Sequence, residues 1–152
     1  MKRIEIYTEG NISLPYKELT AKYIETLTKK ILTLNKVDNV ALCIILTDNE
    51  VIHKINREYR SKDKPTDVIS FAYRDEPFPL CDGMEEELGD IYISLEKAEE
   101  QAKDFEVTFM DEFLRLLIHG ILHLLGYDHE RSIEDERIMQ KLEEDILQKI
   151  SG

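Results

Sequence analysis

The sequence predicts an α+β domain in which a small mixed sheet of four strands packs against about five helices. Two kinds of segment that alternate along the chain predict this class. Short segments are rich in β-branched and aromatic residues, and longer ones place apolar residues at every third or fourth position. With 152 residues, the chain fits a single domain over residues 1–152, and its 34% of charged residues indicates a highly charged surface.

The first three elements are a strand, a helix and a second strand. Residues 4–8 alternate apolar and polar side chains, which predicts a half-buried strand. Residues 15–34 repeat apolar side chains at helical spacing, which predicts an amphipathic helix. The apolar run of residues 40–46 predicts a buried strand and is far shorter than the roughly 20 residues that span a bilayer. We therefore expect no membrane span.

A short helix and a third strand follow. Thr47 and Glu50 form a capping-box pattern, in which each side chain accepts a hydrogen bond from a backbone N–H, and they predict a helix that ends near Tyr59. Pro65 excludes further helix, and the β-forming residues 68–73 predict the third strand.

The remaining elements are a fourth strand and three helices. Residues 91–93 predict the strand, and Ser94 caps a helix that ends near Lys103. Residues 108–125 are apolar on nearly every face, as expected of a helix at the centre of the domain. Ser132 begins a final amphipathic helix.

The sequence also contains one long loop and two cysteines. Residues 74–88 contain two prolines and an acidic run, and they predict either a flap over a site or a solvated linker. Cys43 and Cys81 form no CxxC pair, so we expect neither a disulfide nor a cysteine metal site. The N-terminal segment lacks the apolar stretch of a signal peptide, which predicts a cytoplasmic protein.

Three of the four histidines lie within eleven residues and predict a metal site. His119 and His123 share one helix face, and Gly126 can adopt the left-handed conformation that ends many helices and returns His129 to the same ion. Three imidazoles on a tetrahedral zinc leave one position for water, as in catalytic sites, and nickel or another divalent ion could bind the same nitrogens. The alternative is histidines packed in the core without metal, although unpaired imidazoles in so apolar a segment would be costly.

Gly120 separates this pattern from the HExxH zinc peptidases, whose catalytic glutamate follows the first histidine. A three-histidine zinc site can still activate water for hydrolysis. If the substrate is a phosphodiester, an arginine would stabilise the charge of the transition state. Arg60 or Arg57 could supply it, or each could be a helix-end charge that meets only solvent.

Charge is distributed unevenly along the chain. The net charge of −12 argues against non-specific binding to nucleic acid. Residues 54–64, however, carry five basic and two acidic side chains, a local net charge of +3. Arg60, Lys62 and Lys64 could contact an anionic substrate there, or they could form a solvated helix end and loop.

Residues 119–129 read HGILHLLGYDH, residues 56–71 read NREYRSKDKPTDVISF, and residues 89–94 read GDIYIS. The three segments resemble the YbeY family of bacterial rRNA maturation endoribonucleases. The first matches the family signature HGxLHLxGYDH, and the second is similar to N-x-x-Y-R-x-x-D-K-P-T-[DN]-V-[LI]-S-F, with Ser61 where glycine is common. The resemblance covers the chain from about residue 42 to residue 145.

The resemblance implies a metal-dependent, single-strand-specific endoribonuclease that acts in maturation of the 16S rRNA 3′ end and in ribosome quality control. It implies that His119, His123 and His129 bind one zinc ion, that a zinc-bound water attacks the phosphodiester, and that Arg60 contacts the phosphate.

Because the chain is acidic, we expect RNA binding to depend on a local basic groove that includes Lys62 and Lys64, and on a small-subunit ribosomal protein that presents the RNA. Two alternatives remain open. One is a ribosome-assembly factor with a structural metal and no turnover, and the other is a metallopeptidase without the usual glutamate.

Overall fold

A four-stranded mixed sheet forms the centre of the fold. The computed structural model describes residues 1–75, 84–127 and 132–151. The strands are β1 (Lys2–Glu9), β2 (Val40–Thr47), β3 (Val68–Ala72) and β4 (Glu86–Ser94). They lie in the order β1-β2-β4-β3, with β1, β2 and β4 parallel to one another and β3 antiparallel to β4.

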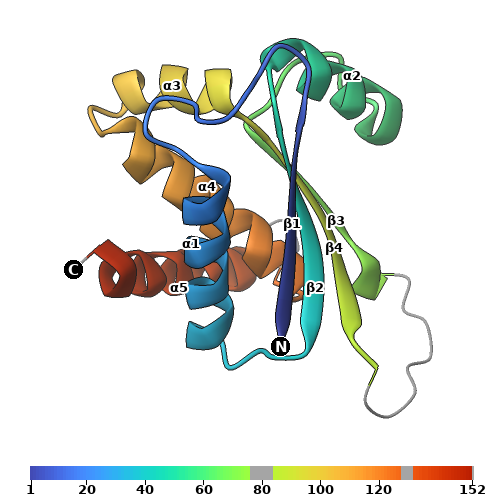
Figure 1. The fold of residues 1–152 in the computed structure, drawn as a ribbon, viewed down its shortest axis with the longest axis vertical. Helices are drawn as coiled ribbons and strands as arrows, with labels where there is room; N and C mark the ends of the chain where they lie inside the picture. The colour runs from blue at the N-terminus through green and yellow to red at the C-terminus, as the bar shows by residue number, and fades with distance from the viewer. Residues whose placement is uncertain (76–83, 128–131, 152) are drawn as a thin grey trace.

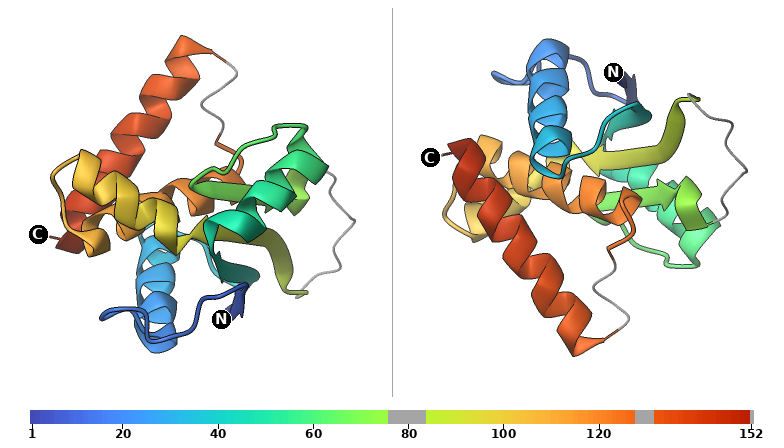
Figure 2. Two further views of the ribbon diagram at one scale, coloured as in Figure 1. Left: turned by 90° about the horizontal axis from the view of Figure 1, so that it is seen from above. Right: turned by 90° about the horizontal axis from the view of Figure 1, so that it is seen from below.

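Helices cover both faces of this sheet unequally. Those in the described ranges are α1 (Ala21–Leu34), α2 (Asn49–Arg60), α3 (Leu95–Asp104), α4 (Phe109–Leu124) and α5 (Ile133–Ser151). Helices α1 and α4 lie against one face, α3 and α5 pack on α4, and α2 lies on the opposite side of the sheet (Figure 1, Figure 2). This arrangement confirms the predicted α+β class. None of these helices is long and apolar enough to cross a membrane.

Helix α4 is the buried central helix that the sequence predicts. Thr108 caps it, because its Oγ1 accepts the N–H of Asp111 at 3.1 Å. Most of its residues are buried, among them Phe113 and Leu117. The helix packs unusually close to the sheet at Gly120, where an added Cβ would lie 2.8 Å from Cγ2 of Ile91. Only glycine fits at this contact without a shift of its neighbours.

The first helices begin at other residues than the sequence predicts. Helix α1 begins at Ala21 rather than at residue 15, since Thr20 is the residue that caps it. Helix α2 is capped by Asp48, whose carboxylate accepts the N–H of Val51 at 2.9 Å. Thr47 is instead the last residue of β2, and its hydroxyl donates to the carbonyl of Ile93. The capping-box prediction was therefore displaced by one residue.

Strand β4 is longer than predicted and shortens the predicted loop. It begins at Glu86, which pairs with Val40 of β2, rather than at residue 91. Its first residues are acidic and carry no apolar alternation, so the strand pattern is absent from the sequence there. Residues 76–83, the centre of the predicted flap, lie outside the described ranges.

Candidate active site

Helix α4 presents His119 and His123 side by side, as their spacing predicts. Their Nε2 atoms are 3.2 Å apart. Two nitrogens bound to one tetrahedral ion at about 2.0–2.1 Å would lie about 3.3 Å from each other. The two imidazoles are therefore placed to serve as ligands of one metal ion.

Glu143 of α5 orients the ring of His119. Its Oε1 forms a short hydrogen bond with Nδ1 of His119, and both side chains are mostly buried. When Nδ1 carries the proton, the carboxylate accepts its hydrogen bond, and the electron pair of His119 Nε2 faces Nε2 of His123. A carboxylate behind a ligating histidine is the usual support of zinc-binding imidazoles.

The position of Glu143 in the sequence indicates that its side chain is buried, although it is charged. The residue lies four positions after Met139 and three before Ile146, and both of these are buried. Glu143 therefore belongs to the apolar stripe of α5, where an unpaired carboxylate would be costly. A charged residue on the buried face of an amphipathic helix indicates a polar partner in the core.

The third predicted ligand, His129, lies outside the described residues. The turn before it is described and has the expected form. Gly126 has a φ of +105°, its N–H donates to the carbonyl of His123, and the N–H of Tyr127 donates to that of Leu122. The glycine thus ends α4 in the left-handed conformation. Within residues 1–75, 84–127 and 132–151, no three His, Cys, Asp or Glu side chains form a metal-binding group.

The position of Gly120 explains why a peptidase-type base is absent. Its Cα faces Ile91 of β4 and Ser70 of β3, on the sheet side of the helix. A glutamate at this position would collide with the sheet. The packing against the sheet thus excludes the glutamate that follows the first histidine in HExxH peptidases. This counts against the metallopeptidase alternative.

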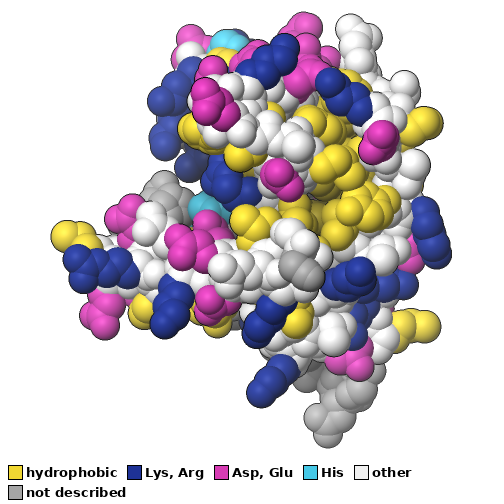
Figure 3. Space-filling model, turned by 90° about the vertical axis from the view of Figure 1, so that its left-hand side faces the viewer, with side chains coloured by type: hydrophobic (Ala, Val, Ile, Leu, Met, Phe, Trp, Pro, Cys, Tyr) yellow, Lys and Arg dark blue, Asp and Glu magenta, His cyan; other side chains and the backbone are white. Residues whose placement is uncertain are grey.

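The two histidines line a cleft of about 480 Å³. The structure brings the predicted phosphate-binding residues Arg60, Lys62 and Lys64 to the same cleft, together with Arg115 and the edge of β3. Figure 3 shows a histidine side chain within a hollow of the surface, with Lys and Arg side chains beside it. Segments that are separated by about 60 residues in the sequence thus form one cationic site.

A buried asparagine positions the basic loop on the rim of this cleft. Asn56 is 1% exposed, and its Nδ2 donates to the carbonyl of Lys64 at 2.9 Å. Its own carbonyl accepts the N–H groups of Ser61 and Lys62. Ser61 ends α2 with a φ of +57°, a left-handed conformation that glycine adopts without strain. The loop thus has a defined backbone conformation, and its residues 60–64 are exposed to solvent.

Arg115 is a second cleft arginine, which sequence reasoning missed. Its guanidinium donates to both carboxylate oxygens of Glu112, at 2.9 and 2.6 Å, and Glu112 is 2% exposed. Gln101 donates to the same carboxylate at 2.6 Å. The hydrogen bond to Glu112 raises the pKa of Arg115, so the side chain stays charged. The pair lies three residues apart in a largely apolar helix, and this spacing was the available signal.

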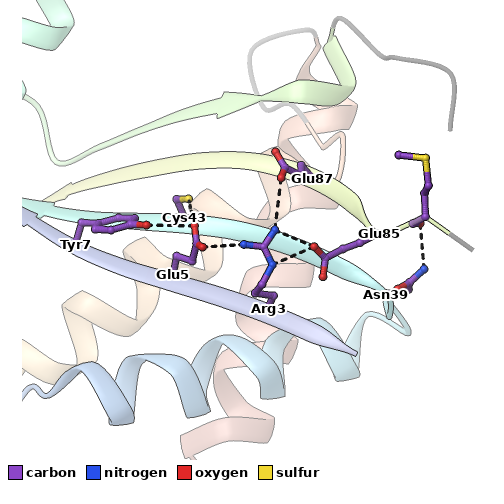
Figure 4. Close-up of polar contacts among 8 residues, drawn as sticks. Arg3, Glu5, Tyr7, Asn39, Cys43, Glu85 and Glu87 are labelled. Carbon is purple, nitrogen blue, oxygen red and sulfur yellow. Dashed lines mark hydrogen bonds and ion pairs between the residues drawn. The ribbon is translucent and has the colours of Figure 1, made fainter.

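A second group of charged side chains lies on the sheet face turned away from α1 and α4 (Figure 4). Arg3 pairs with Glu85 at 2.8 Å and with Glu5 at 2.7 Å, and the Cys43 thiol donates to Glu5 at 3.3 Å. Burial, followed by the hydrogen bond to Glu5, raises the pKa of Cys43 to about 12. The thiol is therefore neutral at physiological pH and unsuited to bind a metal.

The raised pKa predicts that Cys43 reacts slowly with alkylating agents. At pH 8 only about 1 in 10⁴ of its thiols is ionised. We expect iodoacetamide to modify Cys43 at least about 100-fold more slowly than free cysteine, as followed by peptide mass spectrometry. The same protein unfolded in guanidinium should react at the rate of free cysteine. Equal rates in the folded and unfolded protein would contradict the neutral, hydrogen-bonded thiol.

Comparisons with known proteins place the chain in a family. A family model described as "Endoribonuclease YbeY" matches residues 6–151. The Endoribonuclease YbeY of Sulfurihydrogenibium sp. (strain YO3AOP1) is 49% identical over 135 residues, which cover 89% of this chain and 86% of that protein. The protein of the same name from Aquifex aeolicus is 39% identical over 140 residues, which cover 92% of this chain and 90% of that protein.

A solved structure shares the fold. The solution structure of TM1509 from Thermotoga maritima has a TM-score of 0.63 and 31% sequence identity, and the match covers 97% of this chain and 88% of that one. The sequence matches and the shared fold confirm the resemblance carried by the histidine signature. The chain belongs to the YbeY family of endoribonucleases, hydrolases that cleave RNA.

Proposed function

We propose that the chain is a metal-dependent endoribonuclease that cuts single-stranded RNA in the cleft between α4, β3 and the end of α2. We further propose that its substrate is the 3′ end of 16S rRNA, in ribosome maturation and quality control. The observation that carries the proposal is the pair of imidazole Nε2 atoms, 3.2 Å apart, in a cleft that also holds Arg60, Lys62 and Lys64.

In this proposal His119 and His123 hold the ion, and His129 is the third ligand. Three imidazole nitrogens favour zinc, and nickel can bind the same three ligands. When bound, such an ion lowers the pKa of a coordinated water and polarises a phosphoryl oxygen. Glu143 keeps the ring of His119 in the orientation that ligation needs.

The cationic side chains of the cleft would bind the RNA backbone. The planar guanidinium of Arg60 suits two oxygens of the scissile phosphate, where it offsets the charge that develops in the transition state. Lys62, Lys64 and Arg115 would contact the flanking phosphates. The net charge of −12 opposes binding of bulk RNA, so we propose that a protein of the small ribosomal subunit presents the strand in the cytoplasm.

One experiment tests the metal and the activity together. Purified protein is analysed for metal by mass spectrometry and incubated with a single-stranded oligonucleotide that has the sequence of the 16S rRNA 3′ end. We expect about one zinc per chain, cleavage that a chelator stops and added zinc restores, and slower cleavage of the same sequence in a duplex. Cleavage that persists after full removal of the metal would contradict metal dependence. Fully loaded protein that melts differently from metal-free protein but cuts no RNA would instead support the assembly-factor alternative.

The contact of Glu143 with His119 predicts a weaker metal site in a Glu143→Gln variant. Loss of a supporting carboxylate typically lowers metal affinity about 10- to 100-fold. A competition titration with a fluorescent zinc chelator measures this change. Glu144→Gln is the matched control, because the neighbouring residue is exposed. Equal affinities for the two variants would show that Glu143 does not support the ion.

The basic loop predicts a change in the salt dependence of RNA binding. Each phosphate contact with a single strand contributes about 0.7 to the slope of log affinity against log salt. We expect Lys62→Ala/Lys64→Ala to bind a single-stranded oligonucleotide more weakly and to reduce this slope by about 1.4. Lys22→Ala/Lys30→Ala on α1 changes the net charge equally at residues that do not line the cleft, and is the control. The same slope for both double variants would exclude the loop from the RNA interface.

A further inference from the structure

Strand β3 is an edge of the sheet that faces the candidate active site. Within the described parts of the chain it pairs with β4 alone, and Val68, Ile69 and Ser70 line the cleft together with the two histidines. An edge strand presents backbone N–H and C=O groups that no neighbouring strand satisfies. In this protein such groups lie where the RNA strand is proposed to pass.

The register identifies which groups face the cleft. The N–H of Ser94 donates to the carbonyl of Asp67 at 2.9 Å, so Asp67 and every second residue after it pair with β4. The backbone groups of Val68, Ser70 and Ala72 therefore point to the free edge. The N–H of Val68 confirms this direction, since the carboxylate of its neighbour Asp67 accepts it at 2.7 Å.

The free edge is held beside the histidines. The hydroxyl of Ser70 donates to the carbonyl of Gly120 at 3.3 Å, and Gly120 directly follows His119. This contact uses the one proton of the Ser70 hydroxyl, so the backbone N–H is the donor that Ser70 can offer to the cleft, beside its backbone C=O. Among the described residues, no backbone hydrogen bond joins Ser70 to an element other than β4.

We propose that this edge binds a nucleobase of the substrate strand, next to the phosphate held at the histidine pair. The backbone N–H and C=O of Ser70 form a neighbouring donor and acceptor, and the Watson–Crick edge of every base also carries neighbouring donors and acceptors. This inference rests on the proposed function of the cleft and deepens it. It provides a physical basis for single-strand specificity, because a duplex already uses the Watson–Crick edges of its bases.

The charge of the cleft favours RNA over an extended peptide as the occupant. A peptide added as a further strand would need several consecutive free groups along β3. The N–H of Val68 is already bonded to Asp67, and the strand has only five residues. The cations Arg60, Lys62, Lys64 and Arg115 around the same cleft match a polyanion.

The test compares Ser70→Pro with Ser70→Ala in the metal-loaded protein. Proline removes the N–H that points to the cleft and is tolerated on the free side of an edge strand, whereas alanine removes only the hydroxyl. The substrates are a single-stranded oligonucleotide and a set in which one nucleotide at a time near the cleaved bond is abasic. We expect kcat/KM on the intact strand to be about 5- to 10-fold lower for Ser70→Pro than for Ser70→Ala, which keeps the backbone N–H.

The abasic substrates show whether the lost contact is with a base. At one position near the cut, loss of the base should lower the kcat/KM of the unmodified protein by a similar factor, and Ser70→Pro should then add no further loss. Equal kcat/KM values for Ser70→Pro and Ser70→Ala, or equal sensitivity to base loss at every position, would overturn the proposal. Intact RNA cleavage by Ser70→Pro with lost binding of an unstructured peptide would assign the edge to a protein strand instead.

The folding of Ser70→Pro and the cleavage by the unmodified protein are measured as well. If circular dichroism shows that Ser70→Pro does not fold, the abasic series on the unmodified protein decides alone. If the unmodified, metal-loaded protein cuts no single-stranded RNA, the proposed function fails and this inference fails with it. If it cuts all abasic substrates as well as the intact strand, only the base-binding edge is overturned.

Discussion

Replacing His119 by alanine is expected to remove most of the bound metal and to lower RNA cleavage by about 10³-fold or more. A metal ion contributes several kcal/mol of transition-state stabilisation, and each 1.4 kcal/mol corresponds to a factor of ten in rate. The substitution removes one of the two facing Nε2 atoms and leaves the carboxylate of Glu143 without its partner. Metal content by mass spectrometry and single-turnover cleavage measure both effects in the same sample.

The fourth histidine provides the control for this experiment. His53 lies on α2, where its Nε2 is 2.8 Å from Asp63, and it does not line the cleft. His53→Ala should therefore keep the metal and full cleavage. If His119→Ala cuts RNA as the unmodified protein does, the histidine pair is not part of the active site. If the unmodified protein unfolds when its metal is removed, the ion has the structural role of the assembly-factor alternative.

Replacing Arg60 by alanine is expected to leave the metal in place and to lower kcat by about 10²- to 10³-fold. Removing one preorganised donor to a developing negative charge typically costs this much. Arg60 lies at the end of α2 and lines the cleft, but it belongs to a different element from the histidines. Its loss should therefore not change metal content. Arg60→Lys should recover part of the rate, since it restores the charge but not the planar fork of the guanidinium.

Arg57 is the matched control, because it lies on the same helix, is exposed, and does not line the cleft. Arg57→Ala should cut RNA at nearly the normal rate. Equal losses for the two arginine variants would mean that the charge of α2 acts only at long range. A fall in metal content in Arg60→Ala, in proportion to the fall in cleavage, would give Arg60 a structural role.

The sequence predicts those parts of the fold that depend on local periodicity. Helix α4 follows from its apolar residues and its cap at Thr108, and β2 follows from one uninterrupted apolar run. The start of β4 could not be predicted in this way. Glu86 and Glu87 are strand residues because β2 lies beside them, and their side chains pair with Arg74 and Arg3, respectively. Pairing with a distant strand leaves no periodic signal in so polar a segment.

The same division applies to the candidate site. The sequence by itself determined the two imidazoles on one helix face and the glycine turn after them, because i and i+4 spacing is a property of a single helix. Only the tertiary structure decided that Glu143 lies behind His119, that Arg60 and Arg115 share one cleft with the histidines, and that the free edge of β3 faces it. These contacts join elements that are far apart in the chain, and they exist because burying the apolar faces of α2, α4 and α5 brings those elements together.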